Sequence, residues 1–212
     1  MKTLSDSIDA LYDAFSEVPK PRVIEGCPCC IEKKNICTLL SKHRRNLAPE
    51  EISSYASSAF LTVGDVPDYL YFLPRIIEIS CTVPGWWPDP PVTGRAIAET
   101  QPGGWPATRL TAFIELLHAI IHHAIAHDRI LDDFDDWLCA IGKMGIEIEP
   151  FLAQIEGSPA SLLAFYEGNS IPLGKGRLSN SFWNKDDPGH GTVLEWFHSP
   201  HISAMISEAY GL

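Results

Sequence analysis

The sequence predicts an all-α protein, an irregular array or bundle of about eight to ten helices packed against antiparallel neighbours. Apolar residues recur at spacings of three and four along most of the chain, and hardly any segment alternates with period two. The chain has 212 residues, of which 45% are hydrophobic and 20% charged, so it is long enough to bury a substantial core. Short connections favour antiparallel neighbours. We therefore expect one helical domain over residues 1–212, with no clean repeat period.

The amino-terminal part is expected to form four helices, at residues 4–15, 31–43, 48–63 and 65–80. Prolines at 19 and 21 end the first, because proline has no N–H to donate within a helix. Pro49 and the two glutamates after it are typical of a helix start. Gly64 separates the third helix from the fourth, which Asp65 caps and Pro74 is expected to kink or interrupt.

Residues 83–107 are expected to be an irregular loop rich in proline, glycine and tryptophan. The segment holds six prolines, four glycines and three tryptophans. Tryptophan buries a large area, which favours packing of at least part of the loop on the helices. Tryptophan is also enriched at protein interfaces, and Trp86 and Trp87 are therefore candidate contacts for a partner.

The carboxy-terminal part is expected to form six helices, at residues 108–128, 128–145, 149–157, 158–168, 192–199 and 199–211. The first of these has the broadest apolar stripe of the chain. Gly142 or Gly145 is expected to end the second. Proline near the start and glycine at the end bound each of the two short helices that follow, with Gly168 closing the second.

The stretch EGCPCCIEKKNIC, residues 25–37, holds four of the six cysteines. Zinc in structural sites takes four ligands in tetrahedral array, and Cys27, Cys30, Cys37 and His43 form one conceivable set. The spacing matches no familiar zinc module. Buried thiols in a tight turn are the interpretation that we favour, and a reactive or redox thiol is a third possibility.

Two pairs of histidines lie four residues apart in the expected helix 108–128, namely His118 with His122 and His123 with His127. Two imidazoles one turn apart can hold one metal ion. No glutamate lies between them as in H-E-x-x-H. Histidines at the edge between core and water are the alternative interpretation, and we favour it.

The chain carries 16 basic and 27 acidic residues, a net charge of −11. A field of this sign repels phosphate backbones and predicts no nucleic-acid binding, whereas it would steer a basic protein toward the surface. Solubility alone also accounts for it. The densest acidic run, Asp132, Asp133, Asp135 and Asp136, is expected to be a solvated face and a candidate docking patch.

Composition also predicts a cytoplasmic protein. The first fifteen residues include three aspartates where a secretory peptide would need apolar residues. No window approaches the ~18 apolar residues of a membrane span, so no membrane association is expected. Cysteines stay reduced in the cytoplasm, which favours metal binding or buried thiols over disulfides.

Three blocks together resemble a family of uncharacterised bacterial proteins of about this length. They are the GCPCC stretch, residues 55–79 with the sequence F-L-P-R, and the tail that begins at residue 179. The resemblance covers about half of the chain and implies an all-helical protein, with no activity to transfer. It includes Cys27 and Cys30 but not Cys29 or Cys37, which weakens the four-ligand zinc set.

Within the F-L-P-R block, Arg75 is expected to be structural. A buried arginine there is expected to pair with Glu78 or Asp65 and to hold helices together, rather than to bind a ligand.

The sequence contains no G-x-S-x-G motif and no phosphate-binding glycine loop, and GKGR at 174–177 lacks the surroundings of a P-loop. We therefore expect a non-enzymatic acidic interaction protein, for instance an immunity protein that inhibits a basic bacterial toxin or effector. The alternative is a zinc-binding metalloprotein that uses the cysteine cluster or the helix histidines. No other cofactor is expected.

Overall fold

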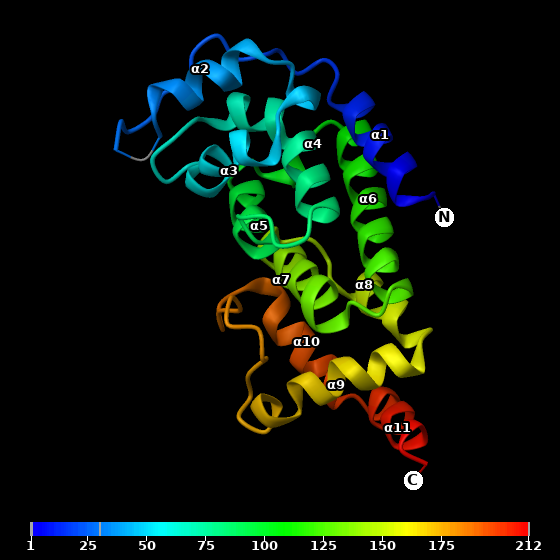
Figure 1. The fold of residues 1–212 in the computed structure, drawn as a ribbon. Helices are drawn as coiled ribbons and strands as arrows, with labels where there is room; N and C mark the ends of the chain where they lie inside the picture. The colour runs from blue at the N-terminus through cyan, green and yellow to red at the C-terminus, as the bar shows by residue number, and fades with distance from the viewer. Residues whose placement is uncertain (1, 30, 212) are drawn as a thin grey trace. The chain divides into compact units, whose positions relative to one another are not determined.

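A computed structural model describes residues 2–29 and 31–211 of the chain (Figure 1). Eleven α-helices lie within these residues, and strand structure there is limited to two isolated bridges, so the all-α class is confirmed. The α-helices are one more than the largest number expected. The chain divides into two compact units, Met1–Leu116 (unit 1) and Leu117–Leu212 (unit 2), where the sequence predicted one domain.

Unit 1 contains the first five α-helices, two short 3-10 turns and the start of a sixth α-helix. They are α1 (Leu4–Ala14), α2 (Lys33–Ser41), η1 (Arg44–Asn46), α3 (Pro49–Ser58), α4 (Val66–Thr82), α5 (Pro90–Glu99), η2 (Pro102–Gly104) and the first half of α6 (Ala107–Ala126). Asp65 caps α4 as expected, since its Oδ1 accepts the N–H of Asp68 at 3.0 Å. Pro74 lies inside α4 without ending it.

The interior of unit 1 surrounds a buried arginine. Arg44, only 5% exposed, lies with its guanidinium 5.0 Å from the centre of the Tyr71 ring. Its Nη1 donates to the carbonyl of Tyr71 at 3.0 Å, and its Nη2 donates to that of Phe15 at 3.0 Å. Carbonyl oxygens and an aromatic face thus compensate a buried cation that has no carboxylate beside it. Because these groups belong to α1, α4 and the turn after α1, the arginine joins separate parts of the unit.

The expectation of an irregular loop at 83–107 needs correction over its middle part. Helix α5 occupies ten of these residues and η2 another three. Two prolines occupy the first positions of α5, where proline is well tolerated because the N–H groups of a first turn have no helical partner. Gly94 is buried inside this helix, as are Ala96 and Ile97. Tertiary packing therefore stabilises a helix that composition alone argues against.

Unit 2 contains the rest of α6, five further α-helices and a π-helical turn. They are η3 (Ile130–Phe134), α7 (Asp135–Lys143), α8 (Glu149–Glu156), α9 (Pro159–Leu173), α10 (Pro188–His198) and α11 (Pro200–Ala209). Gly145, with φ of +69°, follows the end of α7, so of the two glycines expected to end this helix the second does so. Gly168 does not end α9, which continues to Leu173.

Helices α7 and α10 pack against each other through two glycines. A Cβ atom at Gly189 would lie 2.9 Å from the Cα of Gly142, and a Cβ at Gly142 would lie 2.6 Å from the indole ring of Trp183. The backbones of both helices and the ring of Trp183 therefore meet at a point where no side chain fits. On the other side of the unit, Leu162 of α9 packs with Ile202 and Ile206 of α11.

Within residues 2–29 and 31–211, no helix combines the length and the apolar character that crossing a membrane requires.

We predict that Gly189→Ala destabilises the protein, by about 1–3 kcal/mol, because the added methyl collides with the backbone of α7. Gly191→Ala in the same helix is the matched control. A Cβ there would meet nothing within 4 Å, so alanine should raise the free energy of unfolding by about 0.5–1 kcal/mol through helix propensity. Urea unfolding followed by circular dichroism measures both. Equal effects of the two substitutions would contradict the close helix contact.

Candidate functional site

Arg75 is part of a polar network in unit 1. Its Nε and Nη2 donate to the carbonyl of Leu47 at 2.9 and 2.6 Å, and its Nη1 donates to Glu78 Oε2 at 2.7 Å. The hydroxyl of Tyr12 donates to the same glutamate oxygen at 2.6 Å. Of the two partners that the sequence offered, the guanidinium therefore pairs with Glu78, while Asp65 serves as a helix cap. The network ties α1, α4 and the segment before α3 together, which is a structural arrangement.

The two candidate tryptophans of unit 1 differ in their surroundings. Trp86 is half-buried, and its indole Nε1 donates to the carbonyl of Pro49 at 2.9 Å, so this ring anchors its loop to the start of α3. Trp87 is 51% exposed. Of the pair, Trp87 is the one whose ring is accessible to a partner.

The cysteine segment is attached to the turn between α3 and α4. The N–H of Cys27 donates to the carbonyl of Thr62 at 2.9 Å, and that of Gly64 donates to Glu25 at 2.8 Å. The sulfur atoms of Cys27 and Cys29 lie 2.7 Å apart. Cys29 is exposed, so burial does not explain its presence.

The other three members of the expected zinc set are Cys30, Cys37 and His43. Cys37 is exposed on α2, and His43 Nδ1 accepts the N–H of Arg45 at 3.3 Å. Cys30 lies outside the described residues. Among the residues that are described, no group of three or more metal-ligating side chains is placed to hold an ion. Zinc therefore stays a prediction.

The four histidines in and just after α6 lie in different environments. The ring of His118 stacks on Phe151 at 4.3 Å between centroids, and its Nδ1 lies 2.9 Å from the amide nitrogen of Gln154. Burial lowers the pKa of His118. The rings of His123 and His127 lie 4.0 Å apart, and His127 Nδ1 is 2.8 Å from the carbonyl of His123. His118 thus packs against Phe151, whereas His123 and His127 contact each other.

The acidic run does not form the continuous solvated face that the sequence predicted. Asp132 is exposed, Asp133 pairs with Arg129, and Asp136 accepts the side-chain amide of Asn180 at 2.7 Å. Asp135 is buried, only 3% exposed. The first two aspartates belong to the π-helical turn η3. A π-helical turn contains more residues than an α-helical turn. The residues after it are therefore rotated relative to an uninterrupted α-helix, in which one common acidic face was expected.

Asp135 has an unusual environment for a carboxyl group. Burial, supported by the charge of Asp136, raises the pKa of Asp135 to about 7. The nearby indole N–H of Trp183 offsets part of this rise. Among the described residues, neither Asp135 Oδ1 nor Trp183 Nε1 has a partner that meets both the distance and the angle of a hydrogen bond.

A hollow of ≈ 540 Å³ lies beside Trp183, and it is lined mainly by the segment between α9 and α10. Its polar lining includes Arg177, Lys185, His190 and the hydroxyl groups of Ser179 and Ser181. His190, in the first turn of α10, is itself buried, and its ring meets that of Trp183 edge-on at 6.1 Å. The hollow therefore combines two cations, several hydrogen-bond donors and one aromatic ring.

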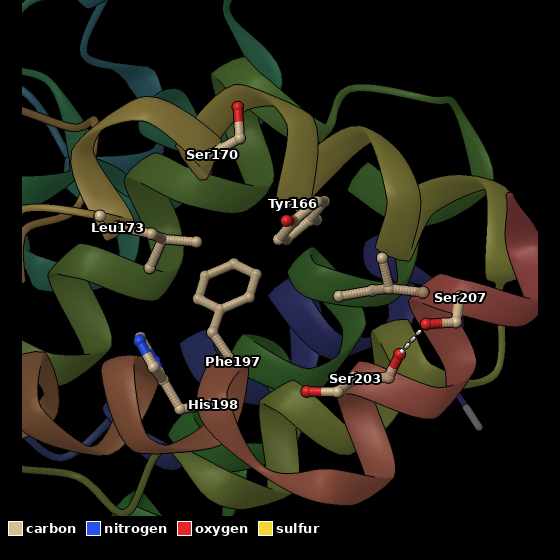
Figure 2. Close-up of a pocket in the computed structure, with 9 residues that line it drawn as sticks. Tyr166, Ser170, Leu173, Phe197, His198, Ser203 and Ser207 are labelled. Atoms are coloured by element: carbon tan, nitrogen blue, oxygen red, sulfur yellow. Dashed lines mark hydrogen bonds between the residues drawn. The ribbon is translucent and has the colours of Figure 1, made fainter. Parts of the chain in front are cut away.

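A second hollow, of ≈ 500 Å³, lies between α9, the end of α10 and α11 (Figure 2). Figure 2 shows the ring of Phe197 reaching toward α9 between Leu173 and Tyr166. Hydroxyl groups of Tyr166, Ser170, Ser203 and Ser207 line it together with His198. The Ser207 hydroxyl donates to the carbonyl of Ser203 at 2.9 Å, and His198 Nδ1 lies 2.8 Å from the carbonyl of Leu194. This hollow has an apolar floor, a neutral polar rim and no charged lining residue among those described.

The chain matches no family model, and comparisons with curated proteins and with solved structures also find no match. The resemblance seen in the three sequence blocks therefore stays an expectation.

The sequence analysis missed the cationic hollow, although its signal was present. Lys175, Arg177 and Lys185 follow one another within eleven residues of an otherwise acidic part of the chain. The GKGR stretch lacks the strand before it and the helix directly after it that a P-loop requires. A loop that connects two helices can hold an anion without that framework.

We predict that the contribution of Asp135 to the stability of the protein falls as pH rises from about 4 to 7, because the folded state keeps a proton on Asp135 that the unfolded chain releases near pH 3.8. The slope contributed by this one group is at most about 1.4 kcal/mol per pH unit. Asp135→Asn removes this contribution. The free energy of unfolding of the variant minus that of the wild type should therefore increase over this range and stay constant above it.

Urea unfolding at about pH 4.5, 6 and 8 measures this difference. The pKa of Asp68 in unit 1 is also raised, to about 6, mainly by burial, but that contribution is common to both proteins and cancels. A difference that does not change with pH would show that Asp135 is ionised throughout.

The zinc alternative predicts about one equivalent of zinc per chain, and its loss in Cys27→Ser, since a structural site needs all four ligands. Elemental analysis of protein purified without chelator measures it. Exposed Cys37 gives a second variant, Cys37→Ser, which separates its contribution from that of the turn. Less than about a tenth of an equivalent in the wild type would exclude a zinc site.

Proposed function

We propose that the protein is a non-enzymatic binding protein and that unit 2 docks a basic protein. The observation that carries the proposal is that two exposed large apolar side chains of the described part of unit 2 lie on α9 or packed against it. Ile171 of α9 is 78% exposed and Leu131 of η3 is 55% exposed. An immunity protein that inhibits a basic toxin or effector is the instance of this class that we favour.

Leu131 packs on α9 at Gly168, three residues before the exposed Ile171. A Cβ atom at residue 168 would lie 2.3 Å from Leu131 Cδ2, so the leucine rests directly on the backbone of α9. Ile171 follows Gly168 by three residues, which is nearly one helical turn. Leu131, Gly168, Ile171 and the exposed Glu167 together form what we call the α9 ridge. Exposed apolar side chains grouped in this way are typical of interaction sites.

The charge of unit 2 defines the kind of partner. Residues 117–212 carry 13 acidic and five basic residues, which is −8 of the net charge of −11. The exposed Asp128 and Asp132 flank Leu131 in the sequence, and Glu167 belongs to the ridge itself. An apolar centre with a charged rim is the usual composition of a protein interface, and an acidic rim attracts a basic partner and speeds its association.

Unit 1 has exposed apolar side chains too, but its charge differs. Val23 and Leu61 are each 63% exposed, and Trp87 is exposed as well. With 14 acidic and 11 basic residues the unit is close to neutral. Charge complementarity therefore supports unit 2 over the tryptophan loop as the docking surface.

We predict that Ile171→Glu and Leu131→Glu each weaken the complex at least about tenfold, since either places a charge in the apolar centre of the interface. Partners captured by the wild-type protein from a lysate of the source organism are identified by mass spectrometry, produced separately and titrated by calorimetry. The expected partner is a basic protein whose affinity falls with added salt.

Val23→Glu in unit 1 is the matched control, because it changes an apolar residue outside the ridge whose exposure, 63%, lies between those of Leu131 and Ile171. This variant should bind as the wild type does. The proposal fails if the recovered partners are acidic, if affinity is indifferent to salt, or if the control weakens binding as much as the ridge variants.

A further inference from the structure

We propose that the hollow beside Trp183 binds a small phosphorylated organic molecule, with the phosphate between Arg177 and Lys185 and the organic part against the indole ring. This site goes beyond the docking function and does not rest on it.

The cations of unit 2 fall into two groups. Arg129 pairs with Asp133, and Lys143 pairs with Asp187 at 2.7 Å. Lys175, Arg177 and Lys185 form no ion pair within the described part of the chain, although acidic residues outnumber basic ones in this unit by more than two to one. All three lie in the segment between α9 and α10, and Arg177 and Lys185 line the hollow.

The segment is held at several points. Asn169, fully buried in α9, accepts the N–H of Ser179 at 2.8 Å through its side-chain oxygen. Asn180 donates to Asp136 and accepts the N–H of Phe182 at 3.0 Å. Leu178, between these two points, is buried. A segment fixed in this way loses little conformational freedom when a ligand binds, which favours affinity.

The last two carbonyl groups of α9 are hydrogen-bonded within the segment that follows the helix. The N–H groups of Lys175 and Arg177 donate to the carbonyl of Pro172 at 2.9 and 3.1 Å, and that of Gly176 donates to Leu173. These bonds satisfy two of the terminal carbonyl groups of the helix, which lowers their availability to repel an anion. The hollow also adjoins the first turn of α10, because His190 of that turn lines it, and the start of a helix is its positive end.

The lining defines the chemical class of the ligand. Arginine and lysine beside serine hydroxyl groups form charge-assisted hydrogen bonds to the oxygens of a phosphate. Trp183, Pro172 and Leu178 supply apolar surface in the same hollow. A volume of ≈ 540 Å³ is in the range of pockets for small organic molecules and exceeds what a bare phosphate would fill. A phosphate ester with a ring or alkyl group matches both parts.

The test is titration of the full chain with phenyl phosphate, followed by calorimetry and by two-dimensional NMR of the indole N–H signals. We expect saturable binding and a shift of the Trp183 signal, assigned with Trp183→Phe. Arg177→Gln and Lys185→Gln should each weaken binding at least about tenfold, because each removes a charged partner of the phosphate. Inorganic phosphate should bind more weakly than phenyl phosphate, and phenol should not bind.

Lys175→Gln is the matched control, since it removes the same charge from the same segment at a residue that does not line the hollow. It should change the affinity less than about twofold. The site is overturned if phenyl phosphate shows no saturation by about 10 mM, or if Lys175→Gln weakens binding as much as Arg177→Gln. Benzoate binding as tightly as phenyl phosphate would overturn the phosphate, and inorganic phosphate binding equally tightly would overturn the organic part.

Discussion

The close approach of α7 and α10 is the contact on which both the cationic hollow and the environment of Asp135 depend. Gly142 and Gly189 allow the two backbones to meet, and the indole of Trp183 covers the junction. This ring forms a wall of the hollow on one side and lies near the buried carboxyl of Asp135 on the other. A larger side chain at Gly142 would collide with the ring, and one at Gly189 would collide with the backbone of Gly142, so one packing constraint affects both polar environments.

Charge in unit 2 is unevenly distributed, and this unevenness makes the two proposed kinds of binding compatible. The unit as a whole is strongly acidic, while the three cations that form no ion pair within its described residues lie in one segment. At physiological ionic strength the field of exposed charges decays over about 8 Å, so nearby groups decide what a particular site attracts. The α9 ridge, with Glu167 at its edge, presents apolar and acidic groups to a protein. Arg177 and Lys185 present cations to a small anion.

One buried and one half-buried arginine lie between the helices of unit 1. Arg44 and Arg75 each donate to main-chain carbonyl groups, and only Arg75 also pairs with a carboxylate, that of Glu78. A guanidinium can satisfy carbonyls from several segments at once because its donors are arranged in a rigid plane. The F-L-P-R stretch, one of the blocks on which the family resemblance depends, therefore has a sufficient structural explanation in this chain.

The sequence by itself determined the helical class and most helix positions, because each follows from local periodicity or capping. It also offered Glu78 as a partner of Arg75, while the structural role of that arginine stays a prediction. Contacts between distant segments decided the rest. Gly168 continues α9 because Leu131 packs on it, and Asp135 turns inward after a π-helical turn that no local pattern predicts. Arg177 and Lys185 line one hollow because two helices and a pinned loop bring them there. The spacing of apolar residues indicates which face of a helix is apolar, but it does not indicate which distant residue packs on that face.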